Sequence, residues 1–184
     1  VIAVGGQGRR IAIDLKKRGV KTSKIFLKLN DKPFLGHLLD MSLALNFRRI
    51  FLLSSYYERE LRIFLKENYP TASQIAPIYG GKLGRKWGVP WLLYSIRQKF
   101  KNPFVYSDGN ILYDKSVLKK IKTTAVLRPA LANVVLSRKD LASTHSRFIL
   151  QGKKIKSIST RLSNSKDSRS LKGRQYYSLG LMAL

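Results

Sequence analysis

The chain has 184 residues, of which 44% are hydrophobic and 10% aromatic, and it contains no cysteine. This length is typical of one globular domain, so we predict a single domain over residues 1–184. The lack of cysteine excludes disulfides and thiolate metal sites. No apolar run approaches the ~20 residues of a membrane helix, and we expect no membrane contact and a cytoplasmic location.

The sequence carries a formal net charge of +26, from 36 Lys and Arg against 10 Asp and Glu. Such a charge attracts polyanions and phosphorylated ligands. The basic residues are spread along the chain and form no single basic tail. A generally basic proteome and a nucleic-acid-binding surface explain this charge equally well.

The first predicted element is a short apolar strand that runs into a glycine-rich loop, VIAVGGQG, at residues 1–8. Glycines let consecutive main-chain N–H groups converge on an anion, and Arg9 and Arg10 add permanent charge behind them. A tight turn would use the same residues. The position directly after an apolar strand favours a phosphate-binding loop.

Residues 30–108 then alternate between helical and extended patterns. Helices are expected where apolar residues recur every three or four positions: at Phe34, Leu38, Met41 and Leu45; at Tyr57, Leu61, Phe64 and Leu65; and at Leu93, Ile96 and Phe100. Strands are expected over 50–53, 74–79 and 104–107, and a glycine-punctuated loop over 80–88. Glu58 and Arg62 are spaced for an ion pair on one helix. The pattern predicts a layered α/β fold.

The last third changes character. Short β-like runs cover 132–136, 147–151 and 155–160, which predicts mixed or antiparallel pairing. Residues 163–173 are polar and serine-rich, as in a surface loop. The sequence begins inside a predicted strand without Met and ends in an apolar run, so we expect both termini to be truncated.

Ligands of parallel α/β sheets bind at the carboxyl ends of the strands. Three features fall at that edge: the loop over residues 5–10, the loop over residues 80–88, and Asp108. A carboxylate beside a phosphate loop is a ligand that suits Mg²⁺, which prefers oxygen donors shared with substrate phosphates. The alternative is a structural turn, since SDGN is also a good turn sequence.

In this order, the segments resemble the sugar-phosphate nucleotidylyltransferases. That family has a strand, a G-x-G-T-R loop, P-K-x-L, and a helix that starts K-P-(L/F)-(L/I). The corresponding segments here are GGQGRR (5–10), SKIFLKLNDKPFLGHLLD (23–40), RRIFLLSSYY (48–57), LGRKWGVPWLL (83–93), YSDGNILYD (106–114) and YYSLGLMAL (176–184). The resemblance spans nearly the whole chain, and KPFLGHLLD is its most specific part. Within this family, the motif sequences of members that act on heptose or mannose 1-phosphate are the most similar to these segments.

The resemblance implies a three-layer, Rossmann-like α/β fold with a mixed, mainly parallel sheet, the nucleotide-diphospho-sugar transferase fold. Residues 1–122 would form the nucleotide-binding half and 123–184 the sugar-phosphate-binding half. The implied reaction transfers a nucleoside monophosphate from an NTP to a sugar 1-phosphate and releases pyrophosphate. Oligomer formation is compatible with this family.

The resemblance also implies roles for individual residues. Arg10 and Lys24 would be catalytic, and Asp108 would hold Mg²⁺. The remaining positions would bind substrate: Gly5, Gly6, Gln7, Gly8 and Gly84 the nucleotide, and Asn110, Arg161 and Gly180 the sugar phosphate. No Ser, Cys or His nucleophile is needed, because the sugar phosphate oxygen attacks, and we expect neither His37 nor His145 to be catalytic.

Two other interpretations stay open. Arg85, Lys86 and Trp87 stand where the family has small residues beside the base, which would suit a catalytically degenerate relative that binds RNA or an acidic protein. In that reading Trp87, Trp91 and Tyr94 are available for stacking, although Trp91 and Tyr94 could equally be core residues. A nicotinamide-binding enzyme ranks third. It needs an acidic residue about 20 positions after the glycines to bind the ribose hydroxyls, and that region holds Lys24, Lys28 and Asn30, with Asp31 as its only acid.

Overall fold

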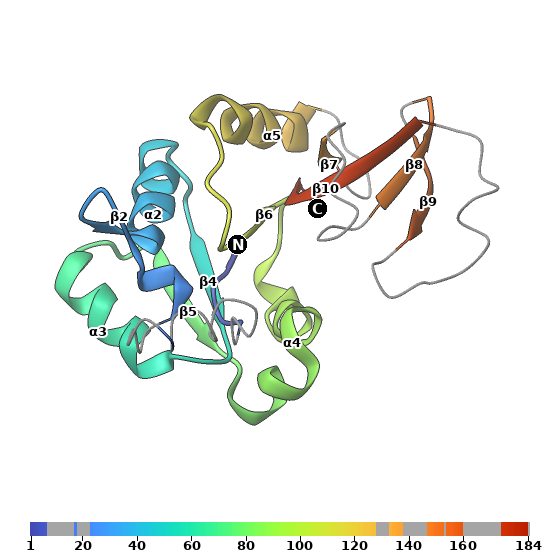
Figure 1. The fold of residues 1–184 in the computed structure, drawn as a ribbon. Coiled ribbons are helices and arrows are strands. Elements are labelled where there is room, and N and C mark those ends of the chain that lie inside the picture. Colours follow the sequence, from blue (N-terminus) through green and yellow to red (C-terminus); the bar gives the residue numbers. More distant parts are fainter. Residues whose placement is uncertain are drawn as a thin grey trace.

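The computed structural model describes residues 1–6, 17, 23–127, 133–137, 147–152, 154–159 and 174–183. Eight strands of these segments form one sheet in the order β5-β4-β1-β6-β10-β8-β9, and β7 pairs with β10 (Figure 1). The strands are β1 (Ile2–Ala3), β4 (Ile50–Ser54), β5 (Ile75–Tyr79), β6 (Val105–Asp108), β7 (Asn133–Ser137), β8 (Arg147–Gln151), β9 (Lys154–Ser159) and β10 (Arg174–Ala183). The predicted mixed α/β sheet is confirmed.

The sheet has a parallel part and an antiparallel part. Strands β5, β4, β1 and β6 are parallel neighbours, whereas β10 runs antiparallel to β6, β7 and β8. Two short strands, β2 (Lys28–Leu29) and β3 (Lys32–Pro33), pair separately. The carboxyl ends of the four parallel strands therefore lie along one edge of the sheet, where the sequence predicted the ligand site.

Strand β4 is buried along its whole length, because helices cover both faces of the sheet. Its residues alternate between two cores, as the pleat requires. Ile50 and Leu52 pack with α2 (Phe34–Ala44) and α3 (Glu58–Asn68), while Phe51 and Leu53 pack with α4 (Gly81–Ser95). The sheet is thus the middle of three layers, with α2 and α3 on one side and α4 on the other (Figure 1).

A third core joins the two parts of the sheet. Leu118 and Ile121 of α5 (Lys115–Leu127) pack with Leu181 and Ala183 of β10, and Met41 of α2 lies against them. No element had been predicted for residues 115–127. The signal was available in the helical spacing of Leu118 and Ile121 and in Asp114, whose Oδ1 accepts a hydrogen bond from the Ser116 main-chain nitrogen at 2.7 Å.

The expected loop over residues 80–88 is wrong. Helix α4 already begins at Gly81 and is interrupted at Gly88, where φ is 69° and ψ is −153°. Pro90 follows the break, so its missing N–H falls near the start of a second helical segment, where a helix tolerates it. Glycines punctuate this segment, as predicted, but they interrupt a helix instead of replacing it.

Two finer expectations also need correction. The buried face of α2 is formed by Leu35, Leu38, Leu39 and Ser42, so the predicted stripe through Phe34, Met41 and Leu45 is half-buried at those three positions. Glu58 accepts a hydrogen bond from the Gly81 main-chain nitrogen at 3.2 Å, and the Arg62 guanidinium lies 4.0 Å from the centre of the Tyr79 ring. These tertiary contacts replace the expected ion pair between the two side chains.

The segment KPFLGHLLD forms a structural unit at the start of α2. The Lys32 ammonium forms an ion pair with the Asp40 carboxylate, and the Tyr69 hydroxyl donates a 2.6 Å hydrogen bond to Asp40 Oδ1. The two ends of the segment are therefore held together and fixed to the end of α3. Among the described helices, none combines the length and apolar composition that a bilayer crossing requires.

Candidate functional site

A cavity of about 320 Å³ lies at the carboxyl ends of the parallel strands. Gly5 and Gly6 follow β1, Ser55 and Tyr56 follow β4, and Asp108 ends β6, and all of them line it. Lys24, in the short 3₁₀ helix η1 (Lys24–Phe26), and residues of α4 complete the wall. The cavity occupies the edge at which open α/β sheets bind ligands.

The structure brings together most of the predicted site residues that it describes. The lining of this cavity includes Gly5, Gly6, Lys24, Gly84, Asp108 and Asn110. Gly180 lies directly beside Asp108. Gln7, Gly8, Arg10 and Arg161 lie outside the described residues, so their predicted roles stay predictions.

Asp108 is held in place by its own strand and by β10. The Tyr106 hydroxyl, two residues earlier on the same face of β6, donates a 2.7 Å hydrogen bond to Asp108 Oδ1. Burial and the Asp108 carboxylate both raise the pKa of Tyr106 above its ordinary value, so the hydroxyl keeps its proton. Tyr106 is not among the predicted site residues, although its position two residues before a candidate metal ligand, on the same face of a strand, was a usable signal.

Gly180 allows β10 to approach the Asp108 carboxylate. Its φ is +65°, and a Cβ built there would overlap Asp108 Oδ2. An L side chain at this position would meet both an unfavourable backbone conformation and a steric clash. Gly180 therefore shapes the position of the carboxylate, and its predicted contact with a sugar phosphate stays a prediction.

We expect Gly180→Ala to lower the free energy of unfolding by about 2 kcal/mol or more, because a left-handed backbone costs an L residue roughly 1–2 kcal/mol before any clash. Urea unfolding measures this change. Gly152→Ala is the matched control, since Gly152 has φ +60° but no described atom within 4 Å of a Cβ. An equal loss in both variants would contradict the close packing of Gly180 on Asp108.

The two described glycines of the first loop have different surroundings. The Gly5 main-chain nitrogen donates to the Leu53 carbonyl at 3.1 Å, and a Cβ at Gly5 would overlap the main chain of Ser54 and Ser55. A Cβ at Gly6 would have no described atom within 4 Å. Gly5 thus permits β1 to end against β4, while Gly6 presents main chain to open space at the cavity.

The same architecture is found in solved structures of other proteins. No family model and no curated protein matches the sequence. Solved structures do match over essentially the whole chain. The inositol-1-phosphate CTP transferase from T. maritima is 16% identical, with a TM-score of 0.72, over 100% of this chain and 68% of its own.

Two further structures agree with this match. A Bacillus anthracis protein described as a glucose-1-phosphate thymidylyltransferase is 18% identical, with a TM-score of 0.76, over 99% of this chain and 69% of its own. HddC from Yersinia pseudotuberculosis is 20% identical, with a TM-score of 0.67, over 100% of this chain and 74% of its own. The chain has the nucleotide-diphospho-sugar transferase fold.

Within this transferase fold, the large residues of α4 leave the cavity open. Arg85 Nε donates to the Ser55 carbonyl at 3.1 Å, and its guanidinium lies 5.5 Å from the centre of the Tyr56 ring. Trp87 is 59% exposed and, like Lys86, does not line the cavity. Of these three substitutions for small residues, Arg85 alone therefore adds its side chain to the cavity wall.

The other aromatic candidates for stacking divide between core and surface. Trp91 packs against the core of Phe51, Leu53 and Leu92, as the structural alternative predicted. Tyr94 is 62% exposed, and the Arg97 guanidinium lies 3.9 Å from its ring centre. His37 Nε2 lies 2.8 Å from the Leu29 carbonyl oxygen, and His37 does not line the cavity, which agrees with a non-catalytic role.

The residues present suit Mg²⁺ only if a substrate supplies further ligands. In the described part of the chain, no group of three His, Cys, Asp or Glu side chains is arranged to hold a metal. Asp108 nevertheless offers carboxylate oxygens at the cavity, in a position fixed by Tyr106 and Gly180. Mg²⁺ is commonly bound by one or two carboxylates plus substrate phosphates, so this donor set fits it.

Proposed function

We propose that the chain transfers a nucleoside monophosphate from an NTP to a sugar 1-phosphate, with release of pyrophosphate. The observation that carries the proposal is one cavity lined by Gly6 after β1, Asp108 at the end of β6 and Lys24 of η1. An exposed main-chain turn, a cation and a carboxylate are what a metal-bound triphosphate requires. The transferase fold supports the same reaction class.

In this proposal the sugar phosphate is the nucleophile. One of its oxygens forms a bond to the α-phosphorus of the NTP, and the bond from the α-phosphorus to the bridging oxygen of the β-phosphate breaks. Pyrophosphate leaves with that electron pair, so no protein nucleophile is needed. Positioning of the two phosphates and neutralisation of their charge account for the catalysis.

Each lining residue then has a defined task. Lys24 neutralises charge that develops on the α-phosphate, and the main chain at Gly6 approaches the triphosphate closely. Asp108 would hold Mg²⁺, which when bound would supply positive charge to the phosphate oxygens. Asn110, exposed at the rim of the same cavity, would contact the sugar phosphate.

The nucleotide and the sugar need a direct screen. The similar structures carry the names of a CTP transferase and a thymidylyltransferase, and HddC was also solved with GMP-PN, so their nucleotides differ. We propose GTP with mannose or heptose 1-phosphate as the first pair of substrates to test, because the motif KPFLGHLLD and the segments around it are most similar to those of the family members that use these substrates. The screen crosses four NTPs with hexose, heptose and inositol 1-phosphates and measures released pyrophosphate.

The alternative is a catalytically degenerate module that binds a protein or RNA partner. The same screen separates the two, because a degenerate module would release no pyrophosphate with any pair. It would also show no increase in melting temperature with any Mg²⁺–NTP. An active enzyme should show both signals with at least one NTP.

We expect Tyr106→Phe to raise the Mg²⁺ concentration needed for half-maximal turnover by about 10- to 100-fold, because residues that orient a metal ligand typically contribute that much. The substitution keeps the buried ring and removes the hydroxyl that donates to Asp108. Pyrophosphate release across a Mg²⁺ titration measures the effect. Tyr94→Phe, on an exposed side chain outside the cavity, should leave the titration unchanged.

A further inference from the structure

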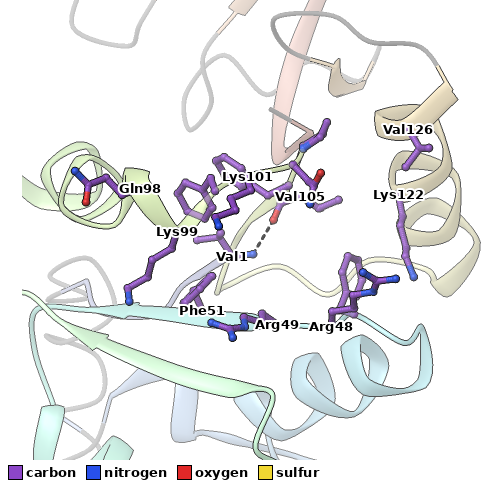
Figure 2. A pocket seen from close by; sticks show the side chains of 15 residues that line it. Val1, Arg48, Arg49, Phe51, Gln98, Lys99, Lys101, Val105, Lys122 and Val126 are labelled. Atoms are coloured by element: carbon purple, nitrogen blue, oxygen red, sulfur yellow. Dashed lines mark hydrogen bonds between the residues drawn. The ribbon is translucent and has the colours of Figure 1, made fainter.

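A second set of hollows lies at the opposite edge of the sheet, where the parallel strands begin. One hollow of about 630 Å³ is bordered by Arg49, just before β4, and by Lys101 and Val105, before and at the start of β6 (Figure 2). A second hollow, of about 670 Å³, shares Arg48 and Arg49 with it. A third, of about 600 Å³, shares Lys122 and Val126 with the first. We refer to these three neighbouring hollows together as the amino-edge groove.

The groove is strongly basic. Its linings contain seven cationic side chains and no Asp or Glu; the cations are Arg48, Arg49, Lys99, Lys101, Lys115, Lys119 and Lys122. All are exposed except Lys122, which is half-buried. Because no described Asp or Glu lines the three hollows, these charges give the groove a positive potential.

Lys122 shows that the groove is fixed to the fold. Its ammonium donates to the Leu45 carbonyl at 2.6 Å and lies 5.0 Å from the centre of the Phe47 ring. It therefore ties α5 to the end of α2, between the hollow that contains Lys115 and Lys119 and the hollow that contains Arg48. Figure 2 shows Lys122 and Arg48 on neighbouring parts of the wall.

Aromatic side chains line the first hollow. Phe100 and Phe104 are stacked, with ring centres 4.0 Å apart and planes 15° apart, and Phe51 meets Phe100 edge-on at 5.9 Å. Phe47, Phe100 and Phe104 are half-buried, so part of each lies open to solvent. Lys99 and Lys101 flank Phe100 in sequence and border the same hollow (Figure 2). The site thus alternates positive charge with aromatic surface.

We propose that the amino-edge groove binds single-stranded nucleic acid. A phosphate backbone carries charge at regular intervals and matches an extended row of cations better than a compact anion does. Unpaired bases can stack on partly open aromatic rings and on guanidinium planes. The bases of a duplex are already stacked on one another and cannot do so. An acidic peptide would match the charge, but it offers planar groups only at its aromatic residues, whereas a nucleic acid offers one at every base.

Fluorescence anisotropy with labelled 20-nucleotide U and dT oligomers, in increasing salt, tests the proposal. We expect binding of one or both strands, with an affinity that falls steeply as salt rises. Tighter binding of the U oligomer would assign the groove to RNA, and equal binding would assign it to either strand. Failure of both to bind at 50 mM salt would overturn the proposal, and so would equally tight binding of a duplex of the same length.

A matched pair of triple variants tests the location. Arg48→Gln, Lys101→Gln and Lys119→Gln together should weaken binding at least about 10-fold at 100 mM salt and reduce the salt slope by about 2, because each lost phosphate contact removes roughly 0.7 from the slope. Arg59→Gln, Lys66→Gln and Lys120→Gln remove the same charge from exposed residues outside the groove. This control should stay within about twofold of the unaltered chain. Equal losses in both variants would overturn the proposal.

Nucleic-acid binding at the amino-edge groove does not require the proposed transferase activity. The groove and the candidate active site lie at opposite ends of the parallel strands and have no lining residue in common. Saturating Mg²⁺–NTP should therefore leave oligonucleotide affinity unchanged. Competition by NTP would overturn the separate location, and displacement of the oligonucleotide by polyglutamate at equal charge concentration would assign the groove to acidic proteins instead.

Discussion

Asp108→Asn is expected to reduce pyrophosphate release by at least about 100-fold. Loss of a residue that only orients a metal ligand typically lowers metal affinity or activity by about 10- to 100-fold, so loss of the ligand's own charge should lower activity at least as much. Asparagine keeps the size of the side chain and can still accept the hydrogen bond from Tyr106, which separates charge from packing. The variant should also lose the increase in melting temperature that Mg²⁺–NTP gives the unaltered chain.

Asp114→Asn is the control for this prediction. Asp114 is fully exposed, and the hydrogen bond from Ser116 lowers the pKa of its carboxyl below the ordinary value. Asparagine is an equally good helix cap, so the control should retain both stability and turnover. More than a tenth of the original turnover in Asp108→Asn would show that this carboxylate is not the metal anchor.

Much of the parallel half of the fold could be predicted from the sequence, because its elements have local signals. The apolar run at residues 50–53 is short and continuous, as expected of a strand covered on both faces, and Leu61 and Phe64 are buried on one face of α3. Where local signals were ambiguous, the predictions failed. The glycines of residues 80–88 are typical of a loop, yet residues 81–87 are helical, Gly84 packs closely on Ser55, and only Gly88 breaks the helix.

The candidate site was predicted through separate segments, and its internal contacts were not. Lys24, Asp108 and Gly84 could each be selected from a motif, and the cavity that they share was expected from the edge rule for parallel sheets. The packing of Gly180 on Asp108 depends on the antiparallel register of β10 against β6. No local pattern encodes that register. The amino-edge groove was hidden for the same reason, since its cations come from three separate stretches of the sequence.

Lys24→Ala is expected to lower turnover about 10³-fold while the chain remains folded. A single cation aimed at a reacting phosphoryl group typically contributes roughly 10³- to 10⁵-fold to the rate. We take the lower end because Arg85 adds a second cation to the described cavity wall. Lys24 is half-buried in η1 at the wall of the cavity, so alanine removes its charge without opening the main core. Initial rates of pyrophosphate release, with KM for both substrates, measure the change.

The kinetic pattern decides whether Lys24 acts on the reacting phosphate. A charge that is needed mainly in the transition state should lower kcat with little change in KM, whereas a residue that only holds the triphosphate should raise KM and spare kcat. Lys28→Ala is the control, because Lys28 is a nearby exposed lysine in β2 and does not line the cavity. It removes the same charge from the chain, so a comparable loss in both variants would mean that overall electrostatic attraction, and not the position of Lys24, accounts for the rate.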